Sequence, residues 1–162
     1  TEVSQLLWAA QGITGSWGGR TAPSAGGLYP LEIYVASHRV EGLPAGTYKY
    51  LPALNQLLRI KKDEISNALT AAALDQAWVR QGAIVIAIAA VYERTTAIYG
   101  ERGIRYVDME AGHAAQNIYL QATALHLGTV TIGAFHDNDV KNVIGMEKTE
   151  IPLYLMPVGK TS

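Results

Sequence analysis

The chain has 162 residues, 49% of them hydrophobic, which suits one domain with one packed core. Its 13 basic and 14 acidic residues leave a net charge of -1, which excludes the positive field that holds nucleic acid or anionic membranes. The longest apolar run, Ala83 to Val91, has about half of the roughly 20 residues that a membrane helix needs. No cysteine is present, so disulfides and thiolate chemistry are excluded. We expect one cytoplasmic domain over residues 1–162, with no nucleic-acid or membrane partner.

The first half of the chain predicts a helix, a strand, a hairpin and a second helix. Apolar residues between positions 3 and 10 share one helical face, and four glycines between positions 12 and 19 predict a mobile loop after it. Alternation predicts a strand over Leu31–Ser37. Residues 48–50 and 57–60 predict a hairpin, and Asp63 is expected to cap a helix that reaches Arg80.

The second half predicts the centre of a sheet and a long helix. Residues 83–91 lack a polar face, which indicates a central strand covered on both sides. Residues 107–127 predict a helix buried nearly all round, either a core spine or a dimer contact. A strand over 129–135, a helix over 139–144 and a strand over 151–158 follow, the last pushed by its prolines toward an edge or an inter-subunit arm. The order predicts an α+β sandwich with helices around a mixed or antiparallel central sheet.

Several common sites are disfavoured by the motifs. No Gly-x-Gly-x-x-Gly follows a strand, no Walker lysine follows a glycine loop, and no histidine pair has metal-binding spacing. We therefore expect no metal site. A hydrolase triad of Ser24, Asp108 and His113 lacks a nucleophile elbow around the serine.

Two glycine-bounded segments are candidates for ligand contact. An arginine beside small residues, as in Arg20–Pro30, can offer a cation and close backbone donors to an anionic planar ligand, although ordinary loops share this composition. The NH groups of Gly133 and Ala134 could face a ligand, or Gly133 could mark a bulge. On the long helix, Glu110 lies one turn before His113, and a structural hydrogen bond is a commoner use for such residues than a metal site.

Together, Arg20–Pro30, Tyr99–Tyr106 and Glu110–Leu120 resemble the SagB-type dehydrogenase branch of the nitroreductase family. Gly133-Ala134-Phe135 and Pro157-Val158-Gly159 fit the same pattern. The matching segments occur in the family's order and span nearly the whole chain. The resemblance favours a ligand-binding loop over an ordinary one.

This resemblance implies a homodimer with two FMN molecules at the interface, each bound by both subunits, and with the long helix as the dimer core. It places the isoalloxazine edge against Pro23, Ser24, Ala25 and Gly26. It places flavin N5 and O4 near the NH groups of Gly133 and Ala134, where donors stabilise the reduced ring. The other implied flavin contacts are Arg20 and Lys160 at phosphate or ribityl, Gly27 at the pyrimidine, and Gln116 and Asn117 by motif.

This sequence departs from the family pattern in three places. The arginine-and-serine motif that grips the phosphate would precede Thr1, so we expect that segment to have been removed or FMN binding to be weakened. Gly27 stands where many nitroreductases carry an asparagine that contacts the flavin pyrimidine, so here backbone groups must make that contact. The lysine-tyrosine pair of azole-forming members aligns with Ile98-Tyr99, which lacks the lysine that could serve as a base.

The leading hypothesis is an FMN-dependent oxidoreductase that moves hydride through flavin N5 between NAD(P)H and an unknown organic substrate. Tyr99 and Arg102 are the candidate catalytic residues on the substrate side, and Tyr29 or Trp17 is expected to line the pocket. One alternative is the azoline-to-azole dehydrogenase of a peptide-modifying complex, which Ile98 disfavours. A non-catalytic flavin-binding or interaction module is the alternative of a different class.

Overall fold

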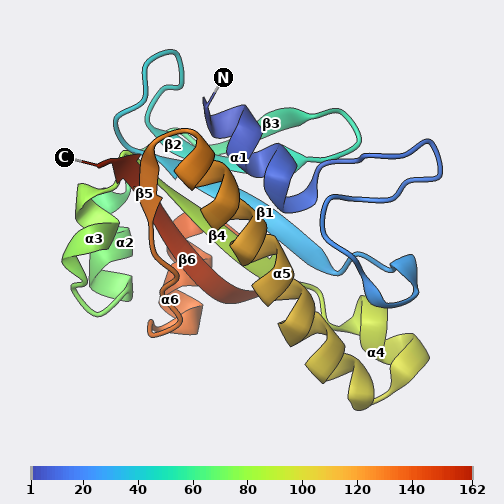
Figure 1. Cartoon of the computed structure of the whole chain (residues 1–162). Coiled ribbons are helices and arrows are strands. Elements are labelled where there is room, and N and C mark those ends of the chain that lie inside the picture. Colours follow the sequence, from blue (N-terminus) through green and yellow to red (C-terminus); the bar gives the residue numbers. More distant parts are fainter. Residues whose placement is uncertain (1, 162) are drawn as a thin grey trace.

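A six-stranded antiparallel sheet forms the centre of the computed structural model, which describes residues 2–161 (Figure 1). The strand order is β3-β2-β1-β4-β6-β5, and every neighbouring pair is antiparallel. The strands are β1 (Leu31–Ser37), β2 (Gly46–Leu51), β3 (Gln56–Lys61), β4 (Ile84–Ala90), β5 (Leu127–Thr129) and β6 (Ile151–Lys160). The α+β prediction is confirmed.

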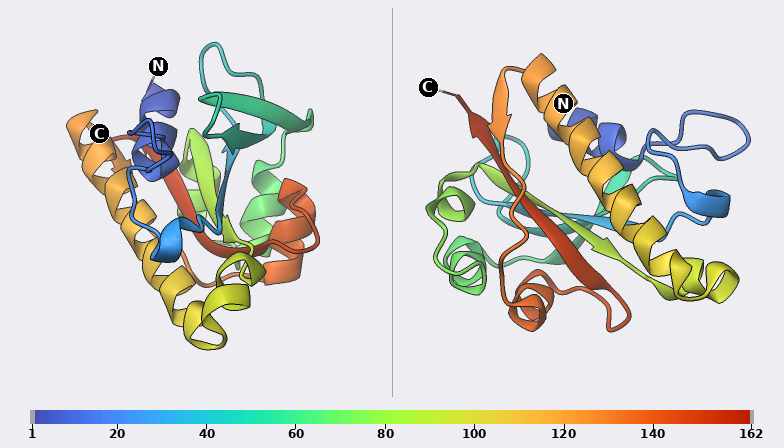
Figure 2. Two further views of the ribbon diagram at one scale, coloured as in Figure 1. Left: turned by 90° about the vertical axis from the view of Figure 1, so that its right-hand side faces the viewer. Right: turned by 60° about the horizontal axis from the view of Figure 1, so that its bottom comes forward.

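Helices cover both faces of this sheet (Figure 2). Side chains alternate along each strand, so the core divides into two clusters. One cluster joins the sheet to α1 (Glu2–Gln11) and α5 (Arg102–Ala124). The other joins it to α2 (Ser66–Ala72), α3 (Ala77–Gln81) and α6 (Asp137–Ile144). Every residue of β4 is buried between the two layers, which confirms it as the central strand.

The helix predicted over 63–80 is wrong in extent. Two helices, α2 and α3, occupy that stretch, and the chain turns between them at Leu74 and Asp75 with φ values of 57° and 56°. A left-handed backbone cannot continue a right-handed helix. The break turns α3 so that Val79 reaches the second cluster.

The long helix differs from its prediction in extent and in burial. It begins at Arg102 instead of 107 and ends at Ala124, and the unpredicted α4 (Glu93–Tyr99) precedes it. Only one face is buried within the chain, because Ile104, Met109 and Leu120 are 47–62% exposed. Burial nearly all round is therefore wrong for a single chain.

The strand predicted over 129–135 is also wrong. β5 ends at Thr129, and beyond it only Ile132 bridges to Leu155. β6 lies between β4 and β5, so the prolines of this strand do not place it at the edge of the sheet. Pro152 and Pro157 instead pair with β4, where they stand opposite Ala89 and Val85. The predicted helix before Gly145 is confirmed as α6, which ends where that glycine adopts φ 86°.

Candidate functional site

A glycine-containing turn, residues 24–27, lies in the segment that leads from α1 to β1. Ser24 closes it at both ends: its carbonyl accepts the NH of Gly27 at 3.0 Å, and its Oγ accepts the NH of Tyr29 at 2.9 Å. Gly26 and Gly27 have φ values of 62° and 65°, a conformation that glycine adopts without strain. Both glycines are exposed, and Pro23 beside them is exposed too. The turn therefore presents bare backbone on which a flat ligand can lie.

The hydroxyl of Tyr99 lies against this turn. A Cβ placed on Gly26 would come within 2.9 Å of Tyr99 Oη, so the absence of a side chain there makes room for the tyrosine. The Tyr99 ring meets the edge of Tyr106 at 5.3 Å between centroids, and the Arg102 guanidinium stands 5.7 Å from the Tyr106 ring. Of the two candidate catalytic residues, the fold thus brings Tyr99 to the turn and places Arg102 one aromatic ring further away.

Arg94 holds α4 beside the turn, and sequence reasoning missed it. Its guanidinium donates to Glu32 at 2.6 Å and to the Tyr29 carbonyl at 3.1 Å. Glu32 also pairs with Lys49 at 3.2 Å. These contacts tie α4 to the start of β1 and to the end of the turn. The two Arg94 contacts join residues more than 60 positions apart, which no local pattern reveals.

Arg20 is turned inward beneath the turn. It donates to Gln11 Oε1 at 2.8 Å and stacks 4.4 Å above the Tyr29 ring, whose hydroxyl accepts the Arg20 NH at 3.1 Å. Burial lowers the pKa of the guanidinium, although an arginine stays protonated in proteins. In this position Arg20 supplies positive charge to the interior of the site, and its predicted contact with phosphate or ribityl stays a prediction.

Glu110 lies on the face of α5 that is turned toward Arg20 and Ser24. It is 3% exposed, and its Oε1 has no hydrogen-bond partner among residues 2–161. Burial raises its pKa to about 7, although the Ser24 hydroxyl and the Arg20 charge act in the opposite direction. His113, one turn further along α5, is exposed, so only Glu110 of this polar pair is buried.

Gln116 and Asn117, the adjacent polar residues of the helix motif, have different surroundings. Asn117 donates from Nδ2 to the Thr21 carbonyl at 3.2 Å, which anchors the segment leading into the turn. Gln116 is exposed and makes no such contact within the described part of the chain.

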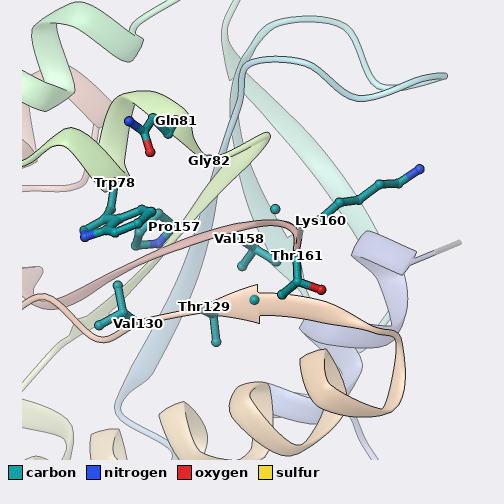
Figure 3. A pocket seen from close by; sticks show the side chains of 11 residues that line it. Trp78, Gln81, Gly82, Thr129, Val130, Pro157, Val158, Lys160 and Thr161 are labelled. Atoms are coloured by element: carbon teal, nitrogen blue, oxygen red, sulfur yellow. The ribbon is translucent and has the colours of Figure 1, made fainter.

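The remaining predicted site residues lie elsewhere on the chain. Gly133 and Ala134 are exposed, and neither NH donates a hydrogen bond within residues 2–161, while Gln76 holds the Ala134 carbonyl at 2.8 Å. Lys160 borders a cleft of about 650 Å³, and its side chain extends away from the end lined by Trp78 (Figure 3). No hydrogen bond, ion pair or ring contact between described residues joins these three to the Ser24–Gly27 turn.

These two groups fit the flavin that the sequence implies. Gly26 and Gly27 leave part of the turn without side chains, the Gly133 and Ala134 NH groups donate to no described residue, and Lys160 is a cation. The described residues contain no cluster of three His, Asp or Glu side chains placed to hold a metal ion. Among the same residues, no helix has the length and apolar character needed to cross a membrane.

Comparison with known proteins identifies the family of the chain. The nitroreductase family model matches residues 1–160. The chain belongs to the nitroreductase family. It is 51% identical over 159 residues to a nitroreductase-family protein of Methanocaldococcus jannaschii, covering 98% of this chain and 79% of that protein. Members of this family are oxidoreductases, so the predicted enzyme class is confirmed at that level.

Two further relatives are less similar in sequence to this chain. The microcin B17-processing protein McbC of Escherichia coli is 28% identical over 148 residues, which cover 86% of this chain and 54% of McbC. The structure of a nitroreductase-family protein from Anabaena variabilis matches with a TM-score of 0.91 at 29% identity. That match covers 98% of this chain and 34% of the Anabaena protein, so these two relatives are much longer.

Proposed function

We propose that this chain is an FMN-dependent oxidoreductase of the SagB-type branch. The observation that carries this proposal is the bare Ser24–Gly27 turn with the Tyr99 hydroxyl held against it, in a chain of the nitroreductase family. Bound FMN would supply hydride transfer at N5, between NAD(P)H and an organic substrate.

The protein's own groups bind and orient in this proposal. Ser24, Ala25, Gly26 and Gly27 provide a partly exposed surface with little side-chain bulk, to which a flat ring can come close, and Pro23 borders it. The free NH groups of Gly133 and Ala134 are donors for electron-rich atoms at the edge of such a ring. In this proposal Tyr99 Oη, which lies beside the turn, would donate a hydrogen bond to a substrate stacked there.

A homodimer completes the proposed site. No hydrogen bond or ion pair between described residues joins the Ser24–Gly27 turn to Gly133, Ala134 and Lys160. In the proposed dimer, one FMN is bound by both subunits, and a partner subunit brings one group to the other. The apolar side chains that α5 leaves exposed, Ile104, Met109 and Leu120, would be covered by that partner. Burial of α5 nearly all round, as its sequence predicts, would then be reached in the dimer.

An absorption spectrum of the purified protein, with NADH and NADPH added anaerobically, tests the proposal. Flavin bands that bleach on addition of either nucleotide support the reductase and identify its electron donor. Flavin that neither nucleotide bleaches favours a dehydrogenase that takes its electrons from the substrate. A colourless protein that binds no added FMN would leave a non-catalytic interaction module as the better description.

A second candidate function is an azoline-to-azole dehydrogenase, favoured by the similarity to McbC. Ile98 argues against it, because the aligned lysine of azole-forming members is absent. Ile98 is 68% exposed next to Tyr99, so a lysine there would fit without repacking. The variant Ile98→Lys gaining thiazoline oxidation that the parent lacks would show that only this side chain separates the two functions.

A further inference from the structure

The interior beneath the glycine turn contains two buried polar atoms whose hydrogen-bonding capacity is unused within residues 2–161. They are Glu110 Oε1 and Gln11 Nε2, on residues that are 3% and 0% exposed. Arg20 interacts with both residues, because it donates to Gln11 Oε1 and its positive charge acts on Glu110. Buried polar groups without partners are costly, so a carboxyl kept in this state invites a functional explanation.

Arg20 does not neutralise Glu110 by direct pairing. The salt bridges among the described residues involve Glu32 and Glu150 as acids, and Arg20 is engaged with Gln11 and Tyr29. Glu32 on β1 and Arg94 on α4 act on Arg20 with opposite sign. From the other packed elements, α1 presents the neutral Gln11, and β4 has only apolar side chains. Burial therefore outweighs charge, and Glu110 with a pKa of about 7 is only partly ionised near neutral pH.

Ser24 links this carboxyl to the turn. Its Oγ already accepts the Tyr29 NH, so the hydroxyl proton is what Ser24 can give, and ionised Glu110 is the acceptor beside it. Once Glu110 carries a proton it becomes a poorer acceptor, and its hold on Ser24 weakens. The ionisation of Glu110 thereby changes how firmly the turn is held.

We propose that Glu110 is a positioning residue that takes up a proton from water when an anionic ligand settles on the Ser24–Gly27 turn, acting through Ser24 and Arg20. The inference rests on the proposed FMN site. Negative charge brought near a buried carboxylate disfavours its ionised form, so the bound state holds the proton more firmly than the free state. Proton uptake also leaves the Arg20 charge free to act on the ligand.

Calorimetric titration of the full chain with FMN at pH 7.5, in two buffers of different ionisation enthalpy, measures this uptake directly. We expect the parent protein to take up a fraction of a proton per FMN and Glu110→Gln to take up less by that fraction. FMN affinity of the parent should fall as pH rises above 7, by at most about tenfold per pH unit, relative to Glu110→Gln. Titration of the FMN phosphate is common to both proteins and cancels in the comparison.

Two further variants make the result decisive. Glu41→Gln removes an exposed carboxylate from a loop outside the site and should match the parent. Ser24→Ala removes the hydroxyl that favours the ionised form of Glu110. Glu110 is then already more protonated in the free protein, so proton uptake on FMN binding should be smaller. This variant tests the inference if Glu110→Gln fails to fold. Equal proton uptake by the parent, Glu110→Gln and Ser24→Ala, with FMN bound, overturns the inference alone. Absence of FMN binding in the folded parent overturns the proposed function and this inference together.

Discussion

Two buried glutamates on opposite sides of the molecule have opposite surroundings. Glu150, 2% exposed, accepts from Lys49 Nζ at 2.6 Å, from the Tyr34 hydroxyl at 2.6 Å and from the Glu147 NH at 2.8 Å. Glu110, 3% exposed, leaves Oε1 without a partner among the described residues. Lys49 and the hydrogen bonds lower the pKa of Glu150 despite burial, whereas burial raises that of Glu110.

The difference shows that partners, not depth, decide the charge of a buried carboxyl. The Glu150 region joins β1, β2 and the loop before β6, and it is satisfied in the way that a structural ion pair must be. The Glu110 region adjoins the turn on which a ligand is proposed to bind. Functional sites commonly retain such unsatisfied groups at a cost in stability.

The largest expected effect on stability comes from removing Lys49, the cation that pairs with buried Glu150. Lys49→Met leaves the Glu150 charge buried without its countercharge, and we expect a loss of about 3 kcal/mol or more in the free energy of unfolding at pH 7.5. Urea denaturation measures it. The control Lys62→Met removes an exposed lysine and should change stability by less than about 0.5 kcal/mol. Similar losses in both variants would mean that Glu150 does not depend on its ion pair.

The pH dependence of unfolding separates the two carboxyls. Glu110 is protonated more readily when folded than when unfolded, so its contribution is complete below about pH 4.5 and is lost as pH rises through about 7. We expect Glu110→Gln to remove this loss, which is at most about 3 kcal/mol between those pH values.

Glu150 has the opposite sign. Its lowered folded pKa gives stability that is present above the ordinary glutamate value and is lost as pH falls below it. The two contributions therefore occur in different pH ranges, and chemical denaturation from pH 3 to 8 resolves them. A parent whose stability does not decline between pH 5 and 8 relative to Glu110→Gln would contradict the assignment.

Substitutions at Gly26 and Gly27 separate the stability cost of backbone strain from that of a steric contact. Gly27→Ala introduces a side chain at φ 65° with nothing within 4 Å, so strain alone should cost about 1 kcal/mol. Gly26→Ala adds a clash with Tyr99 Oη at 2.9 Å and should cost about 2 kcal/mol. Thermal denaturation of both, repeated with Tyr99→Phe, should show that removing the hydroxyl brings the two costs together. Equal costs while Tyr99 is intact would mean that its hydroxyl does not lie at the turn.

The smallest stability change is expected at Arg94. Its bond to Glu32 is half exposed, so Arg94→Gln should cost only about 0.5 to 1 kcal/mol. Because Arg94 holds α4 and thereby Tyr99 beside the turn, KM for the substrate should rise more than this stability loss suggests. Steady-state kinetics compared with Arg80→Gln, an exposed arginine on α3, provides the measurement. Unchanged KM would show that α4 keeps its place without Arg94.

Much of the fold could be predicted because its signals are local. The apolar run of β4 indicates a strand covered on both sides wherever it occurs, and Gly145 ends α6 because of its own backbone freedom. The glycines of the Ser24–Gly27 turn are also visible in the sequence. The break at Leu74 and Asp75 was missed because non-glycine residues adopt left-handed φ there only under tertiary constraint.

By itself, the sequence determined the class of fold, the central strand and the family, and it predicted the two segments that we propose to contact a ligand. Only the tertiary structure decided that Glu110 is buried without pairing, that Glu150 is paired, and that Arg94 positions α4. Backbone conformation and apolar periodicity depend on near neighbours along the chain, so they can be read from it. The ionisation of a side chain depends on which distant residues fold against it, and the sequence gives that no local signal.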